Sequence, residues 1–261
     1  MNQLYLINER ILKDDGISLG GRIDLLYGTD FLYTQAAGLD GFAPDDWATN
    51  RYYGLAMPQL YGEVGNQTAN VKFGHFYTLI GYEVVPAIGN FFYTHAYTMQ
   101  YGEPFTHTGV LGTWNPNDQL SIIAGITNGW DNWDIGLPTN QANPTQGSTS
   151  NAAFLGAVTF SSSDGLQALT IANSSGNEAS GATTLPAGAG QPFIGARSVT
   201  SIVYSNELTD KLTYVYQSDI GYQAHANTAV QTQGQQAGSA YWYGVNNYVF
   251  YNFTDYLIGG F

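Results

Sequence analysis

Two of the four histidines lie in one aromatic stretch of the chain, residues 89–109 (GNFFYTHAYTMQYGEPFTHTG). Its residues His95, Glu103 and His107 are of the types that bind metal ions or transfer protons. Their spacing forms neither an H-x₃-H nor an HExxH motif, either of which would bring two histidines onto one face of a helix. We therefore expect hydrogen-bonding histidines here, with no metal site and no cofactor.

The same stretch holds six of the chain's 33 phenylalanine and tyrosine residues. Alternate residues share one face of a strand, and that face would carry Phe91, Tyr93, His95, Tyr97, Met99 and Tyr101. A helix would instead align residues four apart, which are Tyr93, Tyr97, Tyr101 and Phe105. Periodicity does not decide between the two, so the role of this stretch depends on the elements around it.

The composition indicates an unusual surface. Charged residues make up only 10% of the chain, against roughly 25% in soluble globular domains. The net charge of −13 disfavours nucleic acid and anionic lipid as partners, and the absence of cysteine excludes disulfides and thiolate chemistry. No stretch approaches the ~20 consecutive apolar residues of a membrane helix. If the chain crosses a bilayer, it must do so as a closed β-barrel, because every backbone polar group must be paired inside the membrane.

Period-two alternation of apolar and polar residues is the main structural signal. In residues 17–27, apolar side chains at odd positions alternate with a face that carries Ser18, Arg22 and Asp24. Residues 119–129 and 212–221 repeat the pattern. Such alternation is typical of strands that have two unlike faces.

About twelve such segments follow one another, near 4–12, 17–27, 55–64, 70–80, 105–114, 119–129, 151–160, 166–174, 197–205, 212–222, 240–250 and 256–261. Short connections alternate without exception with long ones, the long ones being about 28–54, 81–104, 130–150, 175–196 and 223–239. Up-and-down barrels with short turns at one end and long loops at the other have this order, and a Greek-key sandwich does not require it. The sequence therefore predicts an all-β, transmembrane up-and-down antiparallel β-barrel.

Three stretches resemble the OmpL-like β-barrel porins of bacterial outer membranes. They are GHFYTLIGYEVVPAIGNFFYTHAYTMQYGEPFTHTGV (residues 74–110), GGRIDLLYGTD (20–30) and NGWDNWD (128–134). The resemblance implies a passive outer-membrane pore without enzymatic activity, whose partners are outer-membrane lipid and small hydrophilic solutes or ions. It also implies a signal peptide and further strands, about 14–16 in all, so we expect residues 1–261 to be a fragment of a single barrel domain.

Charged residues on the polar faces of the expected strands are candidates for lining the pore. They are Arg22, Asp24, Glu63, Lys72 and Asp219. Lumen charge sets the ion preference of a barrel, whereas a Lys or Arg at the lipid midplane would cost ~2–4 kcal/mol. The alternative is that these residues form structural ion pairs between neighbouring strands and leave little net field.

The aromatic stretch falls in the second long loop. If that loop folds into the barrel mouth, it would narrow the pore and offer rings and hydroxyls to a solute such as a sugar. The candidates for this constriction are Phe91, Tyr93, His95, Tyr97, Tyr101 and Glu103. The alternative is that these side chains only pack the loop against the barrel wall or a neighbouring subunit.

Acidic residues crowd the long loops: Asp30, Asp40, Asp45, Asp46, Glu83, Glu103, Asp131 and Asp134. They lack the EF-hand pattern of a calcium loop, so we interpret them as a solvated rim. Such a rim predicts a mild cation preference that weakens with salt.

Two other function classes stay open. A hydrolase at the rim of a barrel would need a histidine beside serine or aspartate; His75, His95 and His107 are candidates, and His225 lies in another long loop. A secreted β-rich adhesin or binding protein would stay soluble without detergent. Porins of this size often form homotrimers, which the residues do not demonstrate.

Overall fold

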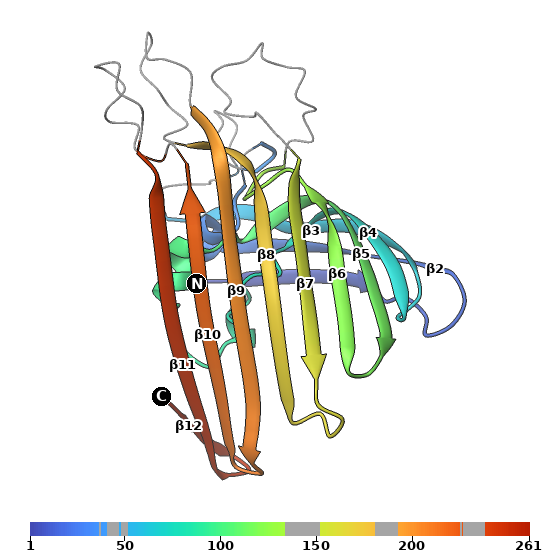
Figure 1. Ribbon diagram of the computed structural model, residues 1–261, viewed down its shortest axis with the longest axis vertical. Coiled ribbons are helices and arrows are strands. Elements are labelled where there is room, and N and C mark those ends of the chain that lie inside the picture. Colours follow the sequence, from blue (N-terminus) through green and yellow to red (C-terminus); the bar gives the residue numbers. More distant parts are fainter. Residues whose placement is uncertain are drawn as a thin grey trace.

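The computed structural model describes residues 1–36, 38–40, 47, 52–133, 152–180, 193–224, 226 and 238–261. These residues form twelve strands in one antiparallel sheet, in which every strand pairs with the next one in sequence (Figure 1). The strands are β1 (Leu4–Arg10), β2 (Ser18–Gly28), β3 (Gly54–Gly65), β4 (Ala69–Tyr77), β5 (Thr106–Asn117), β6 (Leu120–Thr127), β7 (Ala153–Ser161), β8 (Gln167–Ser180), β9 (Phe193–Thr209), β10 (Leu212–Gln223), β11 (Ala240–Thr254) and β12 (Leu257–Gly260). The predicted up-and-down order is confirmed.

The sheet is strongly curved, so that β2 to β5 lie behind β7 to β11 in Figure 1. Within the described residues, β1 and β12 stand at the two ends of the strand order and are not paired with each other. None of the helices in the described part of the chain is long and apolar enough to cross a membrane.

All twelve predicted segments contain a strand, and β8 and β9 exceed their predicted bounds the most. β8 has 14 residues and β9 has 17, whereas the alternation indicated only 166–174 and 197–205. The ladder between them continues up to the pair Ser180↔Phe193. Backbone hydrogen bonds need no apolar side chains, so a pairing can extend into Ser, Asn and Gly residues where the hydrophobic pattern fades.

Each strand has one face toward the concave side of the sheet and one toward its outside. In β2, Asp24 and Leu26 are buried, whereas Leu19 and Ile23, on the opposite face of the strand, are exposed. In β10 the buried positions include Gln217 and Asp219, and Ile220 is exposed. Polar residues therefore face inward, as the alternation predicted.

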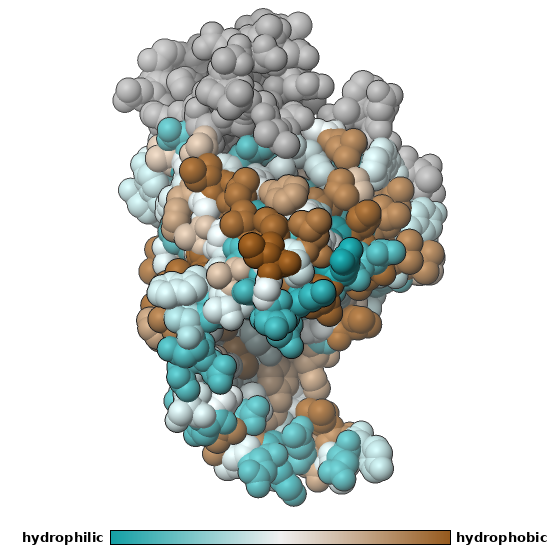
Figure 2. All heavy atoms as spheres, turned by 90° about the vertical axis from the view of Figure 1, so that its right-hand side faces the viewer, coloured by the Kyte–Doolittle hydropathy of each residue, from teal (hydrophilic) through white to brown (hydrophobic). Residues whose placement is uncertain are grey.

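The outside of the sheet carries exposed apolar side chains on most of its strands. Exposed large apolar residues on it include Leu19, Ile23, Val71, Phe73, Val110, Ile126, Phe154, Ile171, Ile202, Ile220 and Val245. In Figure 2, which views the right-hand side of Figure 1, apolar residues gather across the middle of the face and hydrophilic residues lie toward its lower end. A barrel exposes such an apolar band to lipid.

Short turns join the strands at one end of the sheet. Two of them contain a glycine in the left-handed region, Gly16 with φ 69° and Gly165 with φ 74°. This conformation is costly for residues with a Cβ atom, which explains why the turn sequences KDDG and SSSDG end in glycine. The long connections start and end at the opposite end of the sheet, where β2, β4, β6, β8 and β10 end.

Candidate pore constriction

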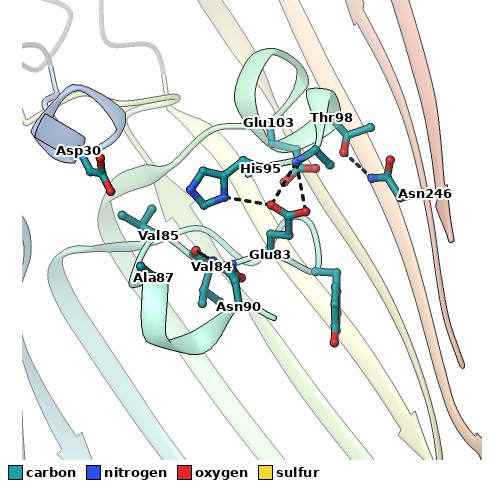
Figure 3. Close-up of polar contacts among 12 residues, drawn as sticks. Asp30, Glu83, Val84, Val85, Ala87, Asn90, His95, Thr98, Glu103 and Asn246 are labelled. Atoms are coloured by element: carbon teal, nitrogen blue, oxygen red, sulfur yellow. Dashed lines mark hydrogen bonds and ion pairs between the residues drawn. The ribbon is translucent and has the colours of Figure 1, made fainter. Parts of the chain in front are cut away.

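Residues 78–105, which connect β4 to β5, lie against the concave face of the sheet, and we refer to them as the inner loop. The inner loop contains one short 3₁₀ turn, η2 (Ala87–Gly89), and one π-helical turn, η3 (Thr98–Gly102). The periodicity of the aromatic stretch, residues 89–109, allowed either a strand or a regular helix, and neither forms over its whole length. Figure 3 shows the inner loop in front of the inner surfaces of the strands.

Apolar side chains of the inner loop fill the space enclosed by the curved sheet. Ile80 packs with Ala157, Ala172 and Val199 of β7, β8 and β9. Val85 and Met99 pack with Leu26 and Ala56 of β2 and β3, and with Phe31 of the 3₁₀ helix η1 (Thr29–Tyr33). Fully burying one such side chain stabilises by about 1.5–3 kcal/mol. The inner loop is therefore a packed part of the interior.

Polar side chains of β9, β10 and β11 hold one side of the inner loop. The backbone N–H of Gly81 donates to Ser201 Oγ (3.3 Å), and that of Tyr82 donates to Gln217 Oε1 (3.2 Å). On β11, Tyr248 donates its hydroxyl to Glu83 Oε1 (2.8 Å). Two more β11 side chains act further along the loop: Asn246 donates to Thr98 Oγ1, and Trp242 donates to the Gly102 carbonyl.

The N-terminal end of the chain holds the other side of the inner loop. Gln3 Nε2 donates to the Val85 carbonyl (2.9 Å), and the Ala87 N–H donates to Gln3 Oε1 (2.9 Å). Asn2 Nδ2 donates to the Tyr93 hydroxyl (2.6 Å). The inner loop is thus attached at both sides and spans the concave face from the beginning of β1 to β11.

A carboxylate–histidine pair braces the inner loop internally. Glu83 Oε2 lies 3.0 Å from His95 Nδ1, and the Ala96 N–H donates to both oxygens of Glu83 (3.1 and 3.2 Å) (Figure 3). The His95 ring also contacts the edge of Tyr33 from η1, with 5.3 Å between the ring centroids. The predicted role of His95 as a hydrogen-bonding residue agrees with this geometry.

A second carboxyl group of the inner loop, that of Glu103, is buried beside Asp219 of β10. Gln217 Nε2 donates to Glu103 Oε1 and to Asp219 Oδ2, both at 2.6 Å. Burial raises the pKa of Glu103, and the neighbouring Asp219 carboxylate raises it further. In the described part of the chain, the salt bridges involve Arg22 and His95 and none reaches Glu103 or Asp219. Burial, with no salt bridge from the described residues, therefore favours the protonated form of Glu103.

The backbone at Gly81 makes room for the Glu103 carboxyl group. Gly81 has φ +87°, and a Cβ atom there would lie 2.0 Å from Glu103 Oε2. A side chain at position 81 would be strained by the backbone and would displace Glu103. The position of the buried Glu103 carboxyl group therefore requires a glycine at position 81.

The five candidates for lining the pore do not gather at one place. Arg22 contacts Asp24 (2.7 Å) and Glu9 (3.5 Å) on the inner face of β1 and β2. Glu63 lies opposite Lys72 in the β3–β4 register. The Lys72 Nζ atom is 4.1 Å from the centroid of the Tyr61 ring. These four candidates form one wall, whereas the fifth, Asp219, lies beneath the inner loop on β10.

The six constriction candidates also separate. His95, which is half-buried, and Glu103, which is buried, are the anchors described above. Phe91 packs on Phe250 of β11, with 5.1 Å between ring centroids. The three tyrosines are exposed: Tyr93 (84%), Tyr97 (81%) and Tyr101 (74%). Part of the stretch thus packs the inner loop, as the alternative reading expected, and part of it presents rings to the open space.

The interpretation of the acidic loop residues as a solvated rim is wrong for Glu103 and Asp40, which are buried. Asp40 accepts hydrogen bonds from the backbone of Ala36 and Met57 and from the indole of Trp133. Short polar side chains that satisfy backbone N–H groups need no solvent. Three other members of that set, Asp45, Asp46 and Asp134, lie outside the described residues.

The histidines show no arrangement of a hydrolase in the part of the chain that the structure describes. His75 bonds Thr108 Oγ1 (2.7 Å), and its ring stacks on Trp133. His107 bonds Thr78 Oγ1 and the Gly129 carbonyl. His225 lies outside the described residues. No group of three acidic, histidine or cysteine side chains suited to a metal occurs among the described residues either.

Sequence reasoning missed the residues that receive the inner loop. They are Gln3, Ser201, Gln217, Trp242, Asn246 and Tyr248. Those on β9 to β11 occupy inward positions of their strands, so alternation could have indicated their direction. Only the folded sheet brings them to residues more than 100 positions away in sequence.

Comparison with known proteins gives a family match over the whole chain. The family model described as "Putative beta-barrel porin-2, OmpL-like" matches residues 1–261. No curated protein matches the chain. Among solved structures, the outer membrane channel DcaP of Acinetobacter baumannii is similar at 10% sequence identity and a TM-score of 0.45, with 99% of this chain and 76% of that chain covered.

Proposed function

The chain belongs to the OmpL-like β-barrel porin family, which indicates a porin-type channel of the bacterial outer membrane. We propose that it is a passive diffusion pore narrowed by the inner loop. Small hydrophilic solutes or ions would cross the membrane through the space left beside this loop. Diffusion through a fixed opening requires no chemical step and no cofactor, and we propose no enzymatic activity.

One observation carries the role of the inner loop: it is attached to both sides of the concave face, by Gln3 on one side and by Gln217 and Tyr248 on the other. A segment that only packed against one wall would leave the rest of the lumen free. A segment held on both sides narrows the path at its own level. The exposed rings of Tyr93, Tyr97 and Tyr101 would then border the remaining opening.

We further propose a mild preference for cations. The chain carries 20 acidic residues against seven Lys and Arg. On the described wall of the pore, Arg22 is already neutralised by Asp24 and Glu9. Fixed negative charge near a pore favours cations, and salt screens this effect. A reversal potential of cationic sign that shrinks with ionic strength supports the proposal, and one of anionic sign contradicts it.

Single-channel recording in a planar lipid bilayer tests the pore and its constriction together. The chain contains no cysteine, so Tyr97→Cys places a unique thiol on an exposed position of the inner loop. Reaction with a bulky, positively charged thiol reagent is expected to lower the current step. The matched control is Tyr256→Cys in the turn between β11 and β12, which is also exposed, at 97%.

The outcomes separate the two parts of the proposal. Folded protein that gives no current steps would contradict the pore. Steps that the reagent leaves unchanged at position 97 would contradict the constriction but not the pore. Replacing residues 91–101 by a short Gly-Ser linker should increase the step, and a channel that keeps its wild-type step after this replacement also contradicts the constriction.

A further inference from the structure

A cavity of about 680 Å³ lies between the inner loop, η1 and the N-terminal residues of the chain. We refer to it as the vestibule. Drug-sized ligands occupy cavities of roughly 300–1,000 Å³, so the vestibule is large enough for a small organic solute. Asp30 of η1 and His95 of the inner loop, which both line it, approach it from opposite sides (Figure 3).

The walls of the vestibule are rich in groups that both donate and accept hydrogen bonds. Of the eleven described residues that line it, nine carry a hydrogen-bonding side chain, and the two others are Leu32 and Phe105. Amides such as Gln100 and hydroxyls such as those of the tyrosines offer a donor and an acceptor at once. A ligand with several hydroxyl groups matches such a lining, because each hydroxyl also donates and accepts.

Aromatic rings provide the second feature of the vestibule. Tyr33, Tyr93 and Tyr101 line it together with Phe105. The Tyr33 ring is held by Phe105, at 5.8 Å between centroids, and by His95 at 5.3 Å. A fixed ring presents an apolar face, and the tyrosine hydroxyl adds a polar tip beside it. This combination suits the two kinds of surface on a sugar ring, its C–H face and its rim of hydroxyls.

The charge of the vestibule narrows the class of ligand. None of the described residues that line it is a Lys or Arg, so an anionic solute would find no counter-charge among them. Asp30, the one carboxylate among the described lining residues, already accepts hydrogen bonds from Gln3 Nε2 (3.0 Å) and Thr29 Oγ1 (3.0 Å). His95 is paired with Glu83. An organic cation would use the ring faces and Asp30 but would leave the amides and hydroxyls without partners. A neutral ligand uses all of them.

We propose that the vestibule binds a neutral saccharide before the saccharide passes the inner loop. The inference rests on the proposed function, since it names the solute class of the same pore. Binding at this position would raise the local concentration of sugar at the narrow level and would give the channel a saturable component.

Calorimetric titration of the detergent-solubilised protein with maltotriose tests the site without requiring conduction. Wild type is expected to bind, and Tyr101→Ala is expected to bind about tenfold more weakly, because an exposed stacking ring is lost. Tyr101→Phe keeps the ring and should lose less. Tyr256→Ala, the same substitution at the opposite end of the sheet, should bind as wild type does.

Each result decides the proposal. No heat with maltotriose, or equal affinities of wild type and Tyr101→Ala, would overturn it. Stronger binding of choline than of maltotriose would also overturn it, in favour of an organic-cation site. In bilayers, maltotriose should reduce the current of wild type more than that of Tyr101→Ala. Current steps without calorimetric binding would contradict the saccharide site but not the pore. Calorimetric binding without current steps would contradict the pore but not the saccharide site.

Discussion

Two regions of the concave face accommodate their buried carboxyl groups in different ways. On the wall formed by β1 and β2, Asp24 is fully buried and is paired with the guanidinium of Arg22 at 2.7 Å. Beneath the inner loop, Glu103 and Asp219 are also buried, but they share the amide of Gln217, and among the described residues no salt bridge reaches them. In the first region a fixed cation balances a carboxylate, and in the second burial and a neighbouring carboxylate favour the protonated form of Glu103.

Because of this difference, we expect the two regions to respond differently to a change in pH. A guanidinium keeps its charge at every accessible pH, so the Arg22–Asp24 wall should be constant. A proton is lost as pH rises, so the attachment of the inner loop at Glu103 should weaken. We therefore expect the Arg22–Asp24 wall to be insensitive to pH and the attachment of the inner loop at Glu103 to depend on pH.

The largest effect is expected from Arg22→Ala, which leaves Asp24 buried without a cation. Removing one partner of a buried ion pair costs about 3–5 kcal/mol, so the free energy of unfolding should fall by about that amount. Unfolding in denaturant, followed by tryptophan fluorescence, measures it. Lys72→Ala is the matched control, because that ammonium lies over the Tyr61 ring and its loss should cost only about 1 kcal/mol. Equal losses of unfolding free energy in the two variants would show that the Arg22–Asp24 ion pair has no special role in stability.

A smaller effect concerns pH and the inner loop. The pKa of Glu103 is raised in the folded protein by burial and by Asp219, so folding favours its protonated form. The resulting stabilisation is complete below the ordinary Glu pKa of about 4.3 and is lost as pH rises through the raised value, by at most about 1.4 kcal/mol per pH unit. Glu83 and Asp219 face the same group and add to the repulsion when it ionises.

Hydrogen exchange of residues 78–105, corrected for the intrinsic rate, should therefore show weaker protection at about pH 9 than at about pH 6. Glu103→Gln, which cannot ionise, should remove most of this difference. Glu63→Gln on the opposite wall is the control and should retain it. Protection that does not change with pH in wild type would show that the pair carries no titrating proton in this range.

The smallest effect is expected from Tyr248→Phe, which deletes the hydroxyl that donates to Glu83 at 2.8 Å. One such hydrogen bond is worth about 1 kcal/mol, so the free energy of opening the inner loop should fall by that amount while global unfolding changes little. Tyr243→Phe changes an exposed, outward tyrosine of the same strand and should have no effect. A loss of equal size in both variants would mean that the hydroxyl does not anchor the loop.

Local sequence features were sufficient to predict the strands and their faces. Alternation in residues 17–27 identified Asp24 as inward and Ile23 as outward, and both positions are as expected. The strand ends of β8 and β9 were misjudged, because their terminal Ser and Asn residues pair through the backbone without an apolar pattern. The aromatic stretch was located in the right loop, but its conformation did not follow from its spacing.

The sequence by itself determined the frame of this protein: strand number within the chain, strand order, the inward and outward faces, and the class of membrane protein. These follow from period-two side-chain alternation and from the lengths of the connections, which are local properties. Only the tertiary structure decided where the inner loop lies and which carboxyl groups it buries. Glu103 meets Gln217 across 114 positions of sequence, and such a contact arises from the curvature of the whole sheet, which no local pattern encodes.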